Sequence, residues 1–215
     1  MSKLKIIVGT TRPTRAADNV APWVASVAAD HARFDVEVLD LRDWPLPFFS
    51  EHFGTIGDIN DPTYSDPLVK AWNKTIADAD AYVITTGEYN HSVPAVLKNA
   101  IDSVWVSNGF RNKPVATVGY SAGIGGGTRA IEHLAQIMIE AEAVPLRNAV
   151  VIPLVNDAFN DAGRPTNPIT NAALTVALDD LAWWSTALEQ ARAAGELPPG
   201  RARMRDAMLA AQAAE

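Results

Sequence analysis

Short runs of apolar and β-branched residues recur along the chain and predict five strands. The runs cover residues 4–8, 34–41, 81–86, 114–120 and 145–152. Between and after them lie segments with the spacing of amphipathic helices, at 17–32, 66–79, 94–106, 126–143 and 170–194. Strands that alternate with helices of this length predict right-handed β-α-β units, which place helices on both faces of a parallel sheet.

The number and spacing of the strands favour one α/β domain. Five strands within about 150 residues fit a flavodoxin-like, doubly wound parallel sheet with the strand order 2-1-3-4-5. Ligands of such sheets bind beyond the carboxyl ends of the strands, where the winding changes direction. We therefore expect the functional residues in the loops after the first, third and fourth strands, at 9–17, 86–93 and 120–127.

Two segments lie outside the repeating pattern. The connection 44–64 is long for a compact domain, and its aromatic residues predict either a cap on the core or a contact with another subunit. These aromatic residues are Trp44, Phe48, Phe49 and Phe53. Residues 196–215 contain Pro-Pro-Gly followed by an alanine-rich stretch, which predicts a C-terminal helical tail appended to a domain at 1–195.

Composition narrows the function classes. A net charge of -7 and a pI near 5.1 argue against nucleic acid as a partner. The chain has no cysteine, which excludes thiol chemistry, and its four histidines have no metal-ligand spacing. Redox activity would therefore need an organic cofactor. The apolar run Ile6–Val8 is too short for a signal peptide or a membrane span, so we expect a cytoplasmic protein without a membrane partner.

The motif Gly-Tyr-Ser-Ala-Gly at 119–123 is typical of a serine hydrolase, in which Ser121 would be the nucleophile. Such an enzyme needs a histidine that reaches the serine, and in this fold it follows the serine in the chain. Only His133 follows, and at a rise of ~1.5 Å per residue it lies too far along the next helix. A pairing with His91 stays open, and a Ser121-dependent hydrolase is kept as an alternative.

The first loop, Gly-Thr-Thr-Arg-Pro-Thr-Arg at 9–15, predicts a phosphate site. It lacks the Gly-x-Gly-x-x-Gly pattern of dinucleotide binding, so Asp40 is interpreted as a strand-end residue. The loop supplies threonine hydroxyls, and the following helix supplies free backbone N–H groups. Arg12 and Arg15 add charged donors, and residues 1–17 contain no acidic residue.

The third-strand loop carries a resemblance to a known family. Residues 85–104 read Thr-Thr-Gly-Glu-Tyr-Asn-His-Ser-Val-Pro-Ala-Val-Leu-Lys-Asn-Ala-Ile-Asp-Ser-Val. This stretch closely resembles the signature of the NAD(P)H-dependent FMN reductases, a family that includes quinone, azo and chromate reductases. The family's first-loop pattern appears as Gly9 to Arg12, and its fourth-strand pattern begins at Ser121. Gly87 stands where the family usually has proline.

The resemblance implies a flavodoxin-like protein that binds FMN and uses NADPH or NADH as co-substrate. It implies a phosphate contact in the first loop, and contacts to the flavin ring in the loops after the third and fourth strands. The implied cofactor-binding residues are Thr10, Thr11, Arg12, Arg15, Ala16, Ala17, Gly87, Glu88, Tyr89, Asn90, His91, Ser121 and Gly123. No catalytic side chain is expected, because stacking a nicotinamide on a flavin needs positioning rather than a protein nucleophile.

The resemblance also implies partners. The expected reaction transfers hydride from the nicotinamide to the flavin, and onward to a small acceptor such as a free flavin or a quinone. A homodimer or homotetramer is expected, and a separate monooxygenase that receives reduced flavin stays open as a partner. The principal alternative is a flavodoxin-type electron carrier, which would bind the same cofactor without oxidising a nicotinamide.

Overall fold

A parallel sheet forms the centre of the computed structural model, which describes residues 1–58, 61–62 and 64–214. Its strands are β1 (Ser2–Val8), β2 (Phe34–Asp40), β5 (Ala81–Gly87), β6 (Pro114–Tyr120), β7 (Val144–Pro145) and β8 (Val150–Ile152). Their order is β2-β1-β5-β6-β7, and β8 also pairs with β6. The predicted flavodoxin-like order 2-1-3-4-5 is confirmed, with the fifth strand in two pieces.

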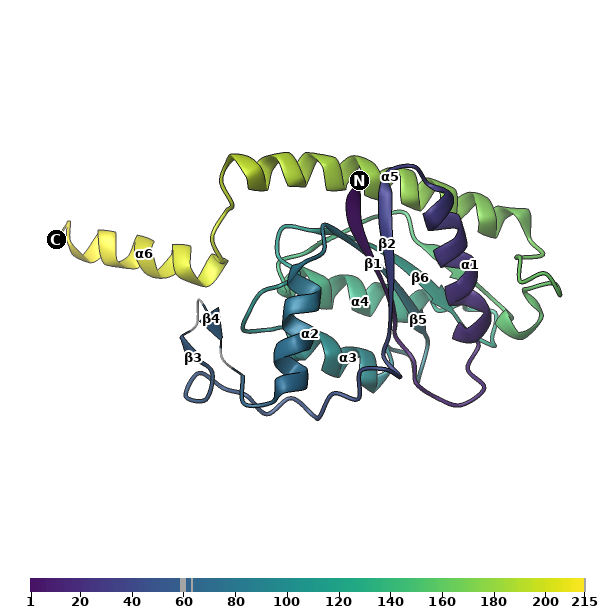
Figure 1. Ribbon diagram of the computed structural model, residues 1–215, viewed down its shortest axis with the longest axis horizontal. Coiled ribbons are helices and arrows are strands. Elements are labelled where there is room, and N and C mark those ends of the chain that lie inside the picture. The colour runs from purple at the N-terminus through teal and green to yellow at the C-terminus, as the bar shows by residue number, and fades with distance from the viewer. Residues whose placement is uncertain (59–60, 63, 215) are drawn as a thin grey trace.

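Helices cover both faces of the sheet, as the alternating pattern predicts (Figure 1). These helices are α1 (Ala17–Asp30), α2 (Pro67–Ala77), α3 (Ala95–Asp102), α4 (Thr128–Glu140) and α5 (Pro168–Ala194). A 3₁₀ turn lies at Val155–Asp157, and a further helix, α6 (Gly200–Gln212), follows α5. The buried residues of α1 and α5 share one apolar cluster, and those of α2, α3 and α4 share another. In Figure 1, α6 leads away from the body of the protein.

The core explains why the strands were visible in the sequence. Successive side chains of a strand point to opposite faces, and β1 accordingly sends Ile6 towards α1 and α5 and Ile7 towards the other three helices. Strands β5 and β6 are buried along their whole length. A strand covered on both faces reads as a continuous apolar run, which is the pattern seen at 81–86 and 114–120.

Two predicted elements are shorter in the structure. The strand predicted at 145–152 is interrupted between β7 and β8, where Asn148 Nδ2 donates to Asp180 Oδ2 of α5 at 2.6 Å. The helix predicted at 94–106 ends at Asp102 and continues as turns. Asn73 donates its side-chain amide to the Ser103 carbonyl at 2.7 Å, so this carbonyl finds a partner outside the helix.

The connection between β2 and α2 combines a cap on the core with exposed aromatic surface. Trp44 packs on a buried tryptophan of α2, with 5.0 Å between the ring centroids. The side chain of Asn99 on α3 fastens this segment by hydrogen bonds of 2.9 Å to Phe49 N and Pro47 O. Phe48 is 86% exposed. Two short antiparallel strands, β3 (Gly57–Asp58) and β4 (Asp61–Pro62), follow, and residues 59, 60 and 63 of the predicted 44–64 arm lie outside the described residues.

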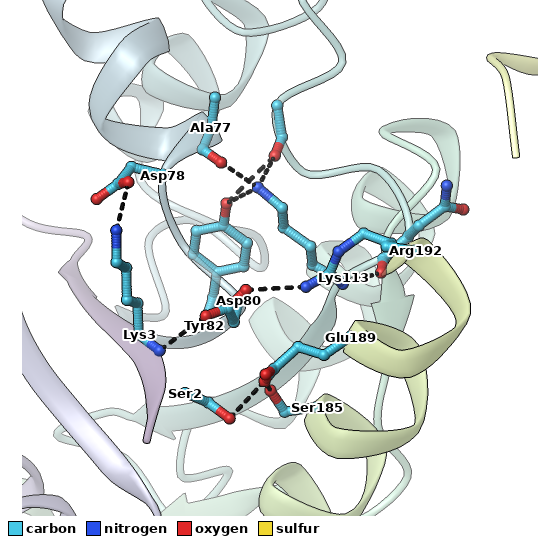
Figure 2. Close-up of polar contacts among 12 residues, drawn as sticks. Ser2, Lys3, Ala77, Asp78, Asp80, Tyr82, Lys113, Ser185, Glu189 and Arg192 are labelled. Carbon is cyan, nitrogen blue, oxygen red and sulfur yellow. Dashed lines mark hydrogen bonds and ion pairs between the residues drawn. The ribbon is translucent and has the colours of Figure 1, made fainter. Parts of the chain in front are cut away.

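The amino edge of the sheet carries a polar network around a buried lysine (Figure 2). Lys113 Nζ donates to Ala77 O at 2.7 Å and to Gly109 O at 2.8 Å. Nearby, Arg192 of α5 donates to Asp80 Oδ1 at 2.9 Å. Burial, with a smaller contribution from the neighbouring Arg192, lowers the pKa of Lys113 to about 8.

The low pKa of Lys113 predicts a pH dependence of stability. Between pH 8 and 10.5 the unfolded chain holds more protons than the folded protein at this lysine, so its contribution to the free energy of unfolding rises with pH. We expect wild type to gain stability relative to Lys113→Met as the pH is raised from 7.5 to about 9.5 in chemical denaturation. Lys70→Met removes an exposed lysine of α2 and should leave the pH profile unchanged. Parallel profiles for wild type and Lys113→Met would contradict this assignment.

Candidate functional site

The loop after β1 presents backbone N–H groups that no other group uses. Several of these N–H groups donate to no acceptor among the described residues. They include the N–H groups of Thr11, Arg12, Thr14, Ala16 and Ala17. Ala16 is the N-cap residue of α1, and it supplies no side-chain cap. Thr14 has a φ of 51°, a left-handed conformation that is uncommon for threonine and marks a constrained turn.

Arg15, which the sequence predicts as a charged donor to phosphate, is buried beneath this loop. Its guanidinium is buried and bonds Asp40 at the end of β2, with 2.8 Å from Nη1 to Oδ1. Its Nε donates to Asp18 Oδ1 at 3.0 Å, and Nη1 also donates to the Thr10 carbonyl. Every guanidinium nitrogen of Arg15 therefore has a protein partner, and the side chain fixes the shape of the loop.

The charges behind the loop form a compact network. Burial by itself would raise the pKa of Asp40, but hydrogen bonds from Arg15 and from the backbone N–H of Arg42 outweigh it and hold the pKa below its usual value. Arg42 also bonds Asp18 and the Arg12 carbonyl, the latter at 2.8 Å. The cations that appear uncompensated in the first 17 residues are partly neutralised by acids from α1 and β2.

The loop after β5 makes a tight turn that exposes two further donors. Tyr89 and Ser92 exchange two backbone hydrogen bonds of 2.9 and 3.1 Å across the turn. Asn90 and His91 between them have φ values of 47° and 73°, the signature of a type I′ turn. Within the described chain, neither backbone N–H of these two residues has a partner. The N–H groups of Glu88 and Tyr89 are bonded internally, so the available donors of this loop are those of Asn90 and His91.

Glu88 uses its side chain to join this loop to α4. The carboxylate is 7% exposed and forms an ion pair with the guanidinium of Arg129. It also accepts a hydrogen bond from the Arg129 backbone N–H at 3.2 Å, at the beginning of α4. A carboxylate at this position is stabilised by the free N–H groups of the first turn. Glu88 thus sets the spacing between the second and third loops.

The loop after β6 is rich in glycine and offers a third set of free donors. Ser121 Oγ donates to Gly123 O at 3.1 Å within its own loop, and among the described residues no histidine is hydrogen-bonded to it. The backbone N–H groups of Ala122, Gly123 and Ile124 have no partner within the described chain. Gly127 has a φ of 88°, and an added Cβ would lie 2.4 Å from the backbone N of Tyr120, so only glycine fits this turn.

Side-chain contacts bring the three loops together. Thr10 Oγ1 and Tyr120 Oη lie 3.2 Å apart beneath them, and burial raises the pKa of Tyr120 to about 12. The Arg12 guanidinium lies over the ring of Tyr89, 5.3 Å from its centroid. Gly87 lies between these groups, because an added Cβ would be within 3.5 Å of Tyr89, Tyr120 and Thr10.

Sequence reasoning missed three residues at this edge. Tyr120 and Arg129 belong to the predicted strand and helix, and their contacts to Thr10 and Glu88 need the tertiary arrangement. His133 lies near the second loop, where its Nδ1 is 2.9 Å from Ser92 Oγ and its ring centroid is 6.3 Å from that of His91. The spacing of His133 from Ser121 predicts its place on the following helix but not its partner.

The described residues contain neither a cluster suited to a metal ion nor a helix suited to cross a membrane. No group of three or more histidine, cysteine or acidic side chains in this part of the chain is arranged to hold a metal ion. No helix among the same residues is both long and apolar enough to cross a membrane.

Comparison with known proteins agrees with this geometry. Residues 2–157 match the family described as NADPH-dependent FMN reductase. An NAD(P)H-dependent FMN reductase of Schizosaccharomyces pombe is 35% identical over 153 residues, which cover 70% of this chain and 74% of the relative. A 2-hydroxy-1,4-benzoquinone reductase of a Burkholderia species is 29% identical over 186 residues, or 85% and 95% of the two chains. The fold matches FerB, a flavoenzyme NAD(P)H:(acceptor) oxidoreductase of Paracoccus denitrificans, with a TM-score of 0.69 and 22% identity over 87% of this chain and 98% of FerB.

The Arg15–Asp40 pair predicts a specific loss of stability. Asp40→Asn leaves a buried guanidinium short of one negative partner, and should lower the free energy of unfolding by about 1–3 kcal/mol at neutral pH. Because the folded pKa of Asp40 is lowered, the deficit should shrink as the pH falls through that value and the wild-type carboxyl is protonated. Urea unfolding at several pH values measures this. Asp35→Asn, an exposed change on the same strand, is the control, and equal stability of the two variants at neutral pH would refute the assignment.

Proposed function

The chain belongs to the family of NADPH-dependent FMN reductases, and we propose that it holds FMN in the three loops that follow β1, β5 and β6. It is an oxidoreductase that uses FMN and a nicotinamide nucleotide. The observation that carries the placement is the set of unpartnered backbone N–H groups at three neighbouring strand ends, counted among the described residues. Free donors at the carboxyl ends of a doubly wound sheet are where this fold binds its ligands.

The first loop fits the phosphate of FMN. Ala16 and Ala17 supply free N–H groups at the positive end of the α1 dipole, and an anion is stabilised there. Thr11 and Arg12 add exposed side-chain donors on the same loop. Thr10 and Arg15, which sequence reasoning included among the direct ligands, are proposed as supports, because both are buried and bonded to protein groups.

The other two loops fit the polar edge of the flavin ring. The N–H groups of Asn90, His91 and Gly123 can donate to ring oxygens and nitrogens, and Ser121 can approach without a nucleophilic role. The lack of a side chain at Gly87 lets Tyr89 pack closely against it, and we propose that Tyr89 borders the ring. Donors at this edge favour the electron-rich reduced ring. Glu88 acts through its ion pair with Arg129, which fixes the separation of the two loops.

When bound, FMN would supply the redox chemistry that links a nicotinamide nucleotide to a second substrate. The residues of this chain position the reactants, since stacking two rings at near-attack distance needs no protein nucleophile. We assign no catalytic side chain. The acceptor is proposed to be a quinone or a free flavin, a choice supported by the benzoquinone reductase among the relatives.

Assembly and location follow as proposals of the same kind. We propose that the protein forms a homodimer or homotetramer, which the exposed aromatic side chains of Phe48 and Trp183 on two different segments support. We also propose that it resides in the cytoplasm. A monooxygenase that takes up reduced flavin is a further partner consistent with a flavin acceptor. A flavodoxin-type carrier is the competing reading, and it differs in having no direct reaction with a nicotinamide.

Anaerobic titration tests this function. We expect the purified protein to bind FMN, NADH or NADPH to bleach the flavin absorbance, and a benzoquinone to restore it. Ser121→Ala should bind FMN modestly more weakly and keep the hydride transfer, because Ser121 Oγ bonds only within its own loop. Bound flavin that neither nucleotide reduces would favour the carrier. Failure to bind FMN, together with ester cleavage that Ser121→Ala abolishes, would favour the hydrolase.

A further inference from the structure

The C-terminal helix α6 has an apolar face that no described residue covers. None of the residues of α6, all of which the structure describes, is buried, and Met204 and Met208 are 66% and 57% exposed. Together with Ala207 and Ala211 these methionines have the spacing i, i+3, i+4, i+7, which places them on one face of the helix. Isolated helices of this length are marginal in water, and most helices in proteins depend on packing of an apolar face. We therefore expect the exposed face of α6 to pack against another surface.

The elbow before α6 holds the helix away from its own domain (Figure 1). Pro198 and Pro199 restrict the backbone just before the helix begins. Gly200 N donates to Glu142 Oε1 at 2.6 Å, and Arg201 donates to Val106 O at 2.9 Å. These contacts fix the base of α6 at the ends of α3 and α4 while the rest of the helix extends outward.

A groove between α3 and α4 offers a matching surface beside that base. It encloses ≈ 160 Å³ and has an apolar floor that includes Ile101, Phe110 and Ile137. Trp105, which is 42% exposed, lines it as well. Glu140 stands at its rim and forms no ion pair among the described residues. Unbranched methionine side chains are suited to irregular apolar spaces of this kind.

We propose that α6 of one copy of this chain docks in the α3–α4 groove of a second copy, and that the exchange is reciprocal. The elbow keeps α6 from the groove of its own chain, although the base of α6 adjoins that groove. A two-fold axis near the base would therefore allow each α6 to reach the groove of the other copy. The charges are also complementary. Arg203 on α6 and Glu140 beside the groove each lack an ion pair within the described chain. Reciprocal docking covers two apolar helix faces and two grooves in a single interface.

Chemical cross-linking tests the proposal directly, because the natural chain has no cysteine. A tagged Met208→Cys protein is mixed with untagged Glu140→Cys protein and treated with a short bis-maleimide, and products are separated by size on a denaturing gel. We expect a covalent dimer of the two variants, in which α6 of one chain is linked to the α3–α4 groove of the other. Leu209→Cys, on the opposite side of α6, should give at least tenfold less heterodimer.

Other outcomes would overturn the proposal. A chain that carries both Met208→Cys and Glu140→Cys should also cross-link between copies; a product confined to single chains at high dilution would mean that α6 folds onto its own groove. Equal yields from Met208→Cys and Leu209→Cys would mean random collision. Absence of heterodimer, with both variants giving the wild-type circular dichroism spectrum, would mean that the groove does not receive α6. None of these readouts depends on FMN, so their failure is distinct from failure of the reductase assignment.

Discussion

The buried contact between Arg15 and Asp40 is the constraint on which the first loop depends. It joins the beginning of α1 to the end of β2, and the same guanidinium bonds the Thr10 carbonyl inside the loop. With its shape held from behind, the loop can leave its outward N–H groups without protein partners. Unsatisfied donors cost stability in isolation, and proteins keep them where a ligand completes them. We therefore propose that the loop receives an anion, and the buried arginine holds its shape.

The two ends of the sheet use their polar groups in opposite ways. At the amino edge, Lys113 is surrounded by carbonyl acceptors and Arg192 is paired with Asp80, so both of these cations are bonded within the protein. At the carboxyl edge, several backbone N–H groups in each of the three loops have no partner among the described residues. The first arrangement stabilises the fold, and the second is the one that we propose receives a ligand. Whether polar groups have partners within the protein therefore distinguishes a structural network from a candidate site more clearly than the identity of the residues does.

The sequence was sufficient to predict the strand order and the three loops, because buried parallel strands leave continuous apolar runs and each loop interrupts such a run. The resemblance at 85–104 then pointed to FMN. The role of Arg15 could not be read in the same way, since an arginine in a phosphate-type loop looks like a ligand until its distance to Asp40 is known. One signal was available: β1 and β2 are neighbours, so Arg15 and Asp40 both follow strands that end at the same edge. Pairs such as Glu88 with Arg129 depend on how α4 is placed against the sheet, which periodicity does not determine.

The central claim is that backbone N–H groups of the first loop hold the phosphate of FMN, and one pair of ligands tests it most directly. Ala16 has a φ of -62°, which suits proline, so Ala16→Pro removes one free N–H donor with little change in shape. Fluorescence titration should show roughly tenfold weaker binding of FMN and unchanged binding of riboflavin, which has no phosphate. Ala16→Ser, which keeps the N–H group, should bind FMN like wild type. Equal losses for FMN and riboflavin, or no loss for either, would contradict the account.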